Sequence, residues 1–218
     1  MTELQTLIRL QAWLSPAFPT GAFSFSHGLE AAVAAGWVTD KATLKEWLAD
    51  LCVHGPGWND AVLLAQAWRS AGDKKACSGV CEHALAMSIS SERHIETAQQ
   101  GTAFLTAANA WADIPEMPDE CPLPVAVGVT AGTMKICLNA TLSAYLHAYL
   151  SNQIQAALRL MKLGQQGGVV LLANLEEIIL QTAQRAASST MDDLGSNTFA
   201  ADISAMQHET LTSRIFRS

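Results

Sequence analysis

Apolar side chains recur along this chain at the spacing of α-helices. In residues 3–14, Leu4, Leu7, Ile8 and Leu14 share one helical face. Prolines shortly afterwards, at positions 16 and 19, end that pattern. A short second helix is expected from about Ser26 to Ala35.

The clearest helical pattern follows Asp40, whose side chain is suited to cap a helix N-terminus. The apolar positions after it follow the i, i+3, i+4, i+7, i+8 rule and are Leu44, Trp47, Leu48, Leu51 and Cys52. The stretch HGPGW at 54–58 ends this helix, and another helix is expected after it.

The rest of the chain divides into longer helical stretches. These are expected at 75–111, with serines near 88–91 marking a break, and at 125–163 and 169–187. The proline-rich segment 113–124 is the clearest loop. No segment shows the alternating pattern of a half-buried strand.

The pattern therefore predicts an all-α protein. We expect a single-domain helical bundle of about eight to ten helices in residues 1–190. A polar C-terminal segment, 191–218, should be partly flexible, with a tail that docks on a partner.

The composition and net charge argue against some classes of function. Half of the residues are hydrophobic and 15% are charged, against roughly 25% charged in ordinary soluble proteins. Such a chain is expected to cover part of its surface with a partner or a second copy. The net charge of −7 argues against nucleic acid. The apolar region 124–150 is too polar and glycine-rich for a membrane span.

Five cysteines and an N-terminus without a basic signal-peptide start indicate a cytoplasmic protein with reduced thiols. Phosphate-loop, dinucleotide, zinc-protease and nucleophile-elbow motifs are absent. One weak metal candidate remains. Cys77 and Cys81 lie one helical turn apart near His83, although two buried thiols on an amphipathic helix explain the same spacing.

Two polar segments are candidate binding elements. Glu92, Arg93, Glu96 and Gln100 have helical spacing, which indicates either a solvated face with surface ion pairs or a polar groove for a partner. The terminal SRIFRS places Phe216 between arginines, a composition typical of an interface hot spot.

The segment SPAFPTGAFSFSHGLE (15–30) has too many aromatic residues for an ordinary surface connector. We expect Phe18 and Phe23 to pack inward and the edge formed by Ser26, His27 and Glu30 to face outward. Phenylalanines that only fill the domain's own core are the competing interpretation.

Five blocks together resemble the UreF family of urease accessory proteins. Besides the segment 15–30 they are SSERHIETAQQGTAFL (90–105), PVAVGVTAG (124–132), AYLHAYLSNQIQAALRLMKLGQQGG (144–168) and ADISAMQHETLTSRIFRS (201–218). Their order matches the family over nearly the whole chain. Phe25 and His27 depart from it, because many members have Tyr and Gln there.

The resemblance implies an all-helical, homodimeric protein without catalysis of its own. It would bridge UreD (also called UreH) and the GTPase UreG, and assist GTP-dependent nickel incorporation into apo-urease. Ni²⁺ would be in transit, with no tightly bound cofactor, and Glu30 is the candidate for a nickel path. The expected partner-binding residues are Ser26, His27, Glu30, Arg93, Gln100, Arg159, Gln165, His208, Glu209, Arg214, Phe216 and Arg217.

A second function from another class stays open at this point. The chain could be a metal-binding chaperone that holds Ni²⁺ through Cys77, Cys81 and His83. An all-α enzyme has little support, because no nucleophile–base or paired-carboxylate pattern stands out.

Overall fold

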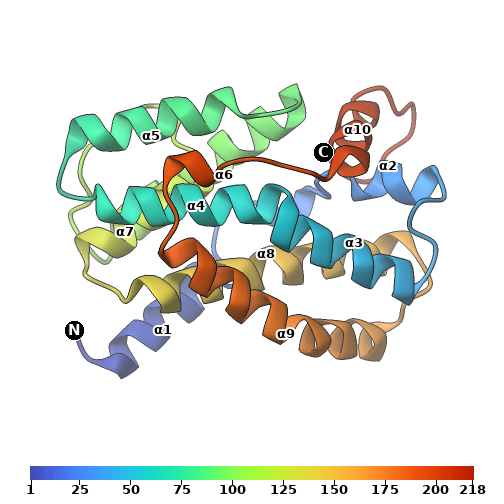
Figure 1. The fold of residues 1–218 in the computed structure, drawn as a ribbon, viewed down its shortest axis with the longest axis horizontal. Helices are drawn as coiled ribbons and strands as arrows, with labels where there is room; N and C mark the ends of the chain where they lie inside the picture. The colour runs from blue at the N-terminus through green and yellow to red at the C-terminus, as the bar shows by residue number, and fades with distance from the viewer.

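The computed structural model describes all 218 residues and contains only helices and loops (Figure 1). The α-helices are α1 (Glu3–Trp13), α2 (Leu29–Ala34), α3 (Lys41–His54), α4 (Pro56–Arg69), α5 (Lys74–Ala86), α6 (Ser91–Ala108), α7 (Leu123–Thr133), α8 (Leu138–Leu160), α9 (Gln165–Ala187) and α10 (Phe199–His208). Two short 3₁₀ turns, η1 (Ala22–Ser24) and η2 (Met191–Asp193), complete the fold. The predicted all-α class is therefore confirmed.

Helices α4 and α7 form the closest pair in the core. A Cβ added to Gly128 would lie 2.4 Å from the carbonyl oxygen of Leu64, and one at Gly132 would lie 2.4 Å from that of Trp68. Glycine at both positions lets the two backbones approach, and α7 is buried from Pro124 to Ala131. The apolar run in this region is thus an internal helix, and no helix in the chain is both long and apolar enough to cross a bilayer.

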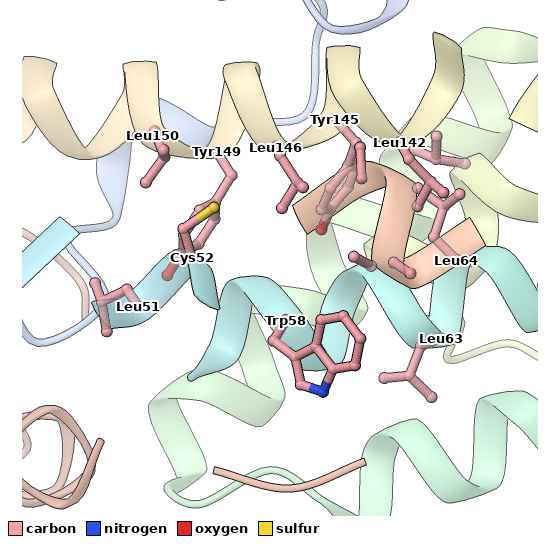
Figure 2. Close-up of a cluster of buried hydrophobic side chains, with 14 of the residues drawn as sticks. Leu51, Cys52, Trp58, Leu63, Leu64, Leu142, Tyr145, Leu146, Tyr149 and Leu150 are labelled. Atoms are coloured by element: carbon pink, nitrogen blue, oxygen red, sulfur yellow. The ribbon is translucent and has the colours of Figure 1, made fainter. Parts of the chain in front are cut away.

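Helix α8 packs against α3 and α4. Figure 2 shows Leu142, Leu146 and Leu150 pointing from α8 toward these helices, with Tyr145 and Tyr149 on the same face. Helix α9 packs along α8 and α3 (Figure 1). All five of these α8 side chains belong to one continuous core.

The end of the chain returns to its beginning. Helix α10 packs on α2, and the C-terminus lies beside them (Figure 1). Gly28 sits at this contact with φ of 79°, and a Cβ there would lie 2.7 Å from the backbone nitrogen of Ala205. Only glycine satisfies both the left-handed backbone and the close approach of the two helices.

Three expectations about the fold need correction. The helix expected over 125–163 is broken between α7 and α8, where Lys135 adopts φ of 54°. Helix α10 lies in a segment for which no helix was expected. The C-terminal tail, expected to be partly flexible, is packed against the protein's own helices, and Phe216 belongs to the core.

Candidate functional site: a charge network around the C-terminal tail

A network of charged side chains lies where α2, α6, α10 and the tail (residues 211–218) meet. Ser90 caps α6 by accepting a hydrogen bond from the Arg93 backbone N–H at 3.2 Å. The helical spacing of α6 then directs several polar side chains to one inward face. The members of the charge network are His27, Glu30, Glu92, Arg93, Glu96, His208 and Arg214.

Glu96 is the centre of the network and only 1% exposed. Its Oε2 accepts hydrogen bonds from Arg93 Nη1 at 2.6 Å and from the Ser218 hydroxyl at 2.8 Å. Its Oε1 accepts from His27 Nε2 at 2.9 Å and from Gln100 Nε2 at 3.0 Å. Burial raises the pKa of Glu96, but Arg93, His27 and Ser218 outweigh this and lower it to about 2.

His27 joins the network from an unusual backbone conformation, with φ of 54°. Its Nδ1 accepts a hydrogen bond from Arg93, and its Nε2 donates to Glu96. One accepting and one donating nitrogen define a neutral imidazole. A non-glycine residue in this region costs energy, which the two polar contacts offset.

Glu30 holds the tail by its backbone. Its Oε1 accepts a hydrogen bond from the Ile215 N–H at 2.7 Å, and its Oε2 accepts one from the Phe216 N–H at 2.9 Å. Burial raises the pKa of Glu30, but these two bonds and the contact with His208 lower it below its ordinary value. Glu92 binds the tail as well, through an ion pair with Arg214.

From Ile215 to Ser218 the tail alternates between exposed and buried residues. Phe216 and Ser218 are buried, whereas Arg214, Ile215 and Arg217 are exposed. The Ser218 carbonyl accepts a hydrogen bond from the Ser26 N–H at 2.6 Å, and the Arg217 N–H donates to the Ser24 carbonyl at 2.8 Å. The segment is therefore fixed on both sides while one face stays open to solvent.

Arg159 of α8 contacts both the tail and the segment 15–30. Its guanidinium lies 4.2 Å from the centre of the Phe216 ring and donates a hydrogen bond to the Phe23 carbonyl at 3.2 Å. Arg217 lies 5.2 Å from the centre of the Phe25 ring. The first cation–π contact ties the tail to α8, and the second ties it to the segment 15–30.

A cavity of about 480 Å³ opens beside the network, between the segment 15–30, α6 and α8. His27, Asp60 and Arg93 line it and also line a smaller cavity of about 80 Å³ beyond. Asp60 accepts a hydrogen bond from the Tyr145 hydroxyl at 2.7 Å. Burial dominates its electrostatics and raises the pKa of Asp60.

Comparison with known proteins decides the family. A sequence profile of the UreF family matches residues 38–176. The chain is 50% identical over 218 residues to "Urease accessory protein UreF" of Rhizobium etli, covering 99% of this chain and 98% of that protein. It is 49% identical over 214 residues to "Urease accessory protein UreF 1" of Brucella anthropi, covering 97% and 94%.

The chain belongs to the UreF family. This confirms the resemblance found in the sequence, and it makes the protein a urease accessory protein from a family that is not itself catalytic.

In this UreF protein, most of the twelve expected partner-binding residues lie around one site. Ten of them take part in the contacts described above, and Glu209 joins them by accepting a hydrogen bond from the Ser91 N–H at 2.8 Å. Gln100 contacts Glu96, and Gln165 lines the larger cavity. Their proposed role in binding a partner remains a prediction.

Their exposure differs from the expectation. The edge expected to face outward is buried: Ser26 is fully covered, and Glu30 and His27 have side chains about one-tenth exposed. The polar face of α6 is likewise largely buried instead of solvated, and its Glu92 and Glu96 contact the chain's own tail. Both oxygens of Glu30 are engaged, so its nickel-path role also stays a prediction.

The expected placement of the phenylalanines in segment 15–30 is correct only in part. Phe18 is buried as expected, against Phe104 at 5.4 Å between ring centres. The inward placement of Phe23 is wrong, because this side chain is 67% exposed. Phe25 is buried beneath Arg217. Phe18 thus packs in the core, and Phe25 packs beneath the tail.

The weak metal candidate does not assemble. Cys77 and Cys81 are buried, whereas His83 is exposed on α5. Cys81 Sγ lies 3.6 Å from Cys121 Sγ, a partner the spacing did not indicate. No group of three or more His, Cys, Asp or Glu side chains is placed to hold a metal ion.

Sequence reasoning gave too little weight to several UreF residues at this site. Glu92 and Glu96 stood out only as members of helical pairs, and their burial depends on the docking of α10 and the tail. Asp60 gave a usable signal, because it is a single acid in the apolar helix α4. Ser218 gave none.

Proposed function

We propose that this UreF protein is a non-catalytic adaptor in urease maturation, which bridges UreD/UreH and UreG and assists GTP-dependent nickel incorporation into apo-urease. The observation that carries the proposal is the docked tail with its open face. Ile215 is exposed between Arg214 and Arg217, and buried contacts hold the backbone on both sides.

A tail that is already fixed supports binding, because its backbone has little conformational entropy left to lose when a partner binds. A side chain on an ordered backbone loses less conformational entropy when it meets a partner. Arginines beside an apolar residue suit a partner that offers carboxylates around an apolar pocket. The adaptor acts in the cytoplasm in this proposal, where urease, UreD/UreH and UreG would be its partners.

Nickel enters the proposal as cargo. Asp60 sits where the two cavities meet, and the larger cavity is also lined by amide side chains such as Asn152 and Gln155. Oxygen ligands bind a late first-row metal more weakly than thiolates, which suits passage instead of storage. We place the passage of Ni²⁺ along this cavity.

The test of the adaptor is complementation. Cells carrying a urease operon without its own UreF gene would receive either the full chain or a version that stops before Ser213. We expect urease activity and nickel content to be restored only by the full chain, and only the full chain to co-purify with UreD and UreG. Equal rescue by a well-expressed truncation would contradict the docking role of the tail.

The cavity proposal has its own test in the same cells. Asp60→Asn should lower the nickel content of urease while UreD and UreG still co-purify with the protein. The exposed Asp192→Asn serves as the matched control and should behave as wild type. Unchanged nickel content in Asp60→Asn would remove Asp60 from the passage.

The chaperone alternative is separated by a double substitution. Cys77→Ala with Cys81→Ala should leave urease activation nearly unchanged if the protein is an adaptor, because neither thiol lies near the tail or the cavity. Loss of activation and of Ni²⁺ binding, in protein that remains folded by circular dichroism, would favour the alternative.

A further inference from the structure

His208, at the end of α10, lies between two carboxylates and is fully buried. Its Nδ1 is 2.7 Å from Glu92 Oε2, and its Nε2 is 3.2 Å from Glu30 Oε2. Glu92 belongs to α6 and Glu30 to α2, so one ring joins three helices.

The contacts define the charge of the ring. A carboxylate oxygen accepts but does not donate, so both contacts are hydrogen bonds only when each ring nitrogen carries a hydrogen, which is the imidazolium form. His27, with one accepting nitrogen, is neutral by the same reasoning.

The surroundings agree with a cation at His208. Two acids, Glu30 from α2 and Glu92 from α6, face the ring, and Arg214 of the tail is the formal cation paired with Glu92. Glu209, the next residue of the chain, turns instead to Ser91. A protonated His208 therefore balances the second carboxylate.

Each of these carboxylates also holds the tail. Glu30 accepts hydrogen bonds from the backbone N–H groups of Ile215 and Phe216, and Glu92 binds Arg214. The His208 side chain itself makes no hydrogen bond to the tail. Its effect on the tail therefore passes through the two carboxylates that it holds.

We propose that His208 is the positioning residue of the tail: its imidazolium orients Glu30 and Glu92, and these in turn fix residues 214–216 with Arg214 and Ile215 facing outward. The inference rests on the proposed function, because the tail is there the docking element. It assigns the shape of the tail's exposed face to a side chain that is itself fully buried.

The experiment compares amide hydrogen exchange in isolated wild-type protein, His208→Gln and the control His94→Gln. Glutamine can donate to one carboxylate but carries no charge, whereas His94 forms an exposed pair with Glu120. We expect exchange at Ile215, Phe216 and Arg217 to be at least about tenfold faster in His208→Gln, with exchange in α4 and α7 unchanged. The control should match wild type. Unchanged tail exchange, or equal acceleration throughout the chain, would overturn the proposal.

Nitrogen NMR of the wild-type rings gives a readout that a packing role would not move and that needs no variant. Under the conditions of the exchange experiment, His208 should show two protonated nitrogens, because each faces a carboxylate oxygen, and His27 should show one, because its other nitrogen accepts a hydrogen bond from Arg93. A neutral His208 would overturn the proposal.

These measurements use no partner, so they separate the two proposals. A loosened tail in His208→Gln together with normal urease activation would leave the positioning role intact and contradict the docking role of the tail.

Discussion

Glu96 shows how one buried acid can organise a site. Four side chains donate hydrogen bonds to its two oxygens, and they come from α6, from the segment 15–30 and from the tail. A buried carboxylate is tolerated only when charged partners and donors surround it. Removal of its charge should therefore affect the fold and the tail together.

The first residue-scale prediction concerns Glu96→Gln. The substitution leaves Arg93 buried without its closest counter-charge, so we expect the free energy of unfolding to fall by about 3–5 kcal/mol in urea denaturation. Glu116→Gln removes an exposed acid paired with Lys74 and should cause no measurable change. A Glu96→Gln protein as stable as wild type would show that the network is not needed for folding.

Acid should weaken the same network. The pKa values of Glu96 and Glu30 are lowered in the folded protein, Glu96 to about 2 from an ordinary 4.5. Stability from such groups is complete above the unfolded pKa and is lost as pH falls through the folded pKa. For Glu96 alone this amounts to roughly 3 kcal/mol between about pH 4.5 and about pH 2. Glu96→Gln should lack this part of the pH dependence, and parallel curves for the two proteins would contradict the assignment.

At the residue scale, the sequence predicts which residues belong to the site better than it predicts what surrounds each of them. The blocks containing Glu30, Arg93 and His208 single out the correct neighbourhood. Whether Glu30 faces a partner or the chain's own tail depends on a contact with Phe216, 186 positions away. Local spacing carries no information about such a contact.

At the scale of elements, helices with local signals were predictable and those set by tertiary contacts were not. Asp40 caps α3 by accepting hydrogen bonds from the backbone of Ala42 and Thr43, as its position predicted. The break before α8 depends on the left-handed backbone conformation of Lys135. A lysine in the sequence does not predict this conformation. Helix α10 keeps Phe199, Ile203 and Met206 exposed, so its periodicity pointed away from a core.

Gly128 provides the prediction for elements. In Gly128→Ala the new Cβ meets a backbone carbonyl of α4, which cannot move without separating the two helices. We expect a loss of about 1–3 kcal/mol in the free energy of unfolding. Gly79→Ala in α5 is the control, because a Cβ there has nothing within 4 Å, and it should stabilise the protein by about 0.5–1 kcal/mol. A shift of the same sign in both variants would contradict the packing argument.

For the whole molecule, apolar surface indicates association. Helix α1 exposes Leu4, Leu7 and Ile8, and α10 exposes Phe199 at 70%. We expect light scattering to give twice the mass of one chain, the homodimer implied by the resemblance to the UreF family, because such surface is costly to leave in water. A monomer mass at working concentration would contradict the dimer and leave these faces to other partners.

The charge network joins residues that the ribosome makes at very different times. Ser26 and Glu30 emerge early, yet their partners in the tail are 192 and 186 positions later. At about 5–20 residues per second, the early residues wait roughly ten to forty seconds for those partners. Helices α3 to α9 can assemble in that interval, but the face that carries Arg214 and Ile215 cannot. A chain that stops before these residues would therefore keep much of the core and lack this surface, so under the proposed docking role the network would keep such a chain out of the complex.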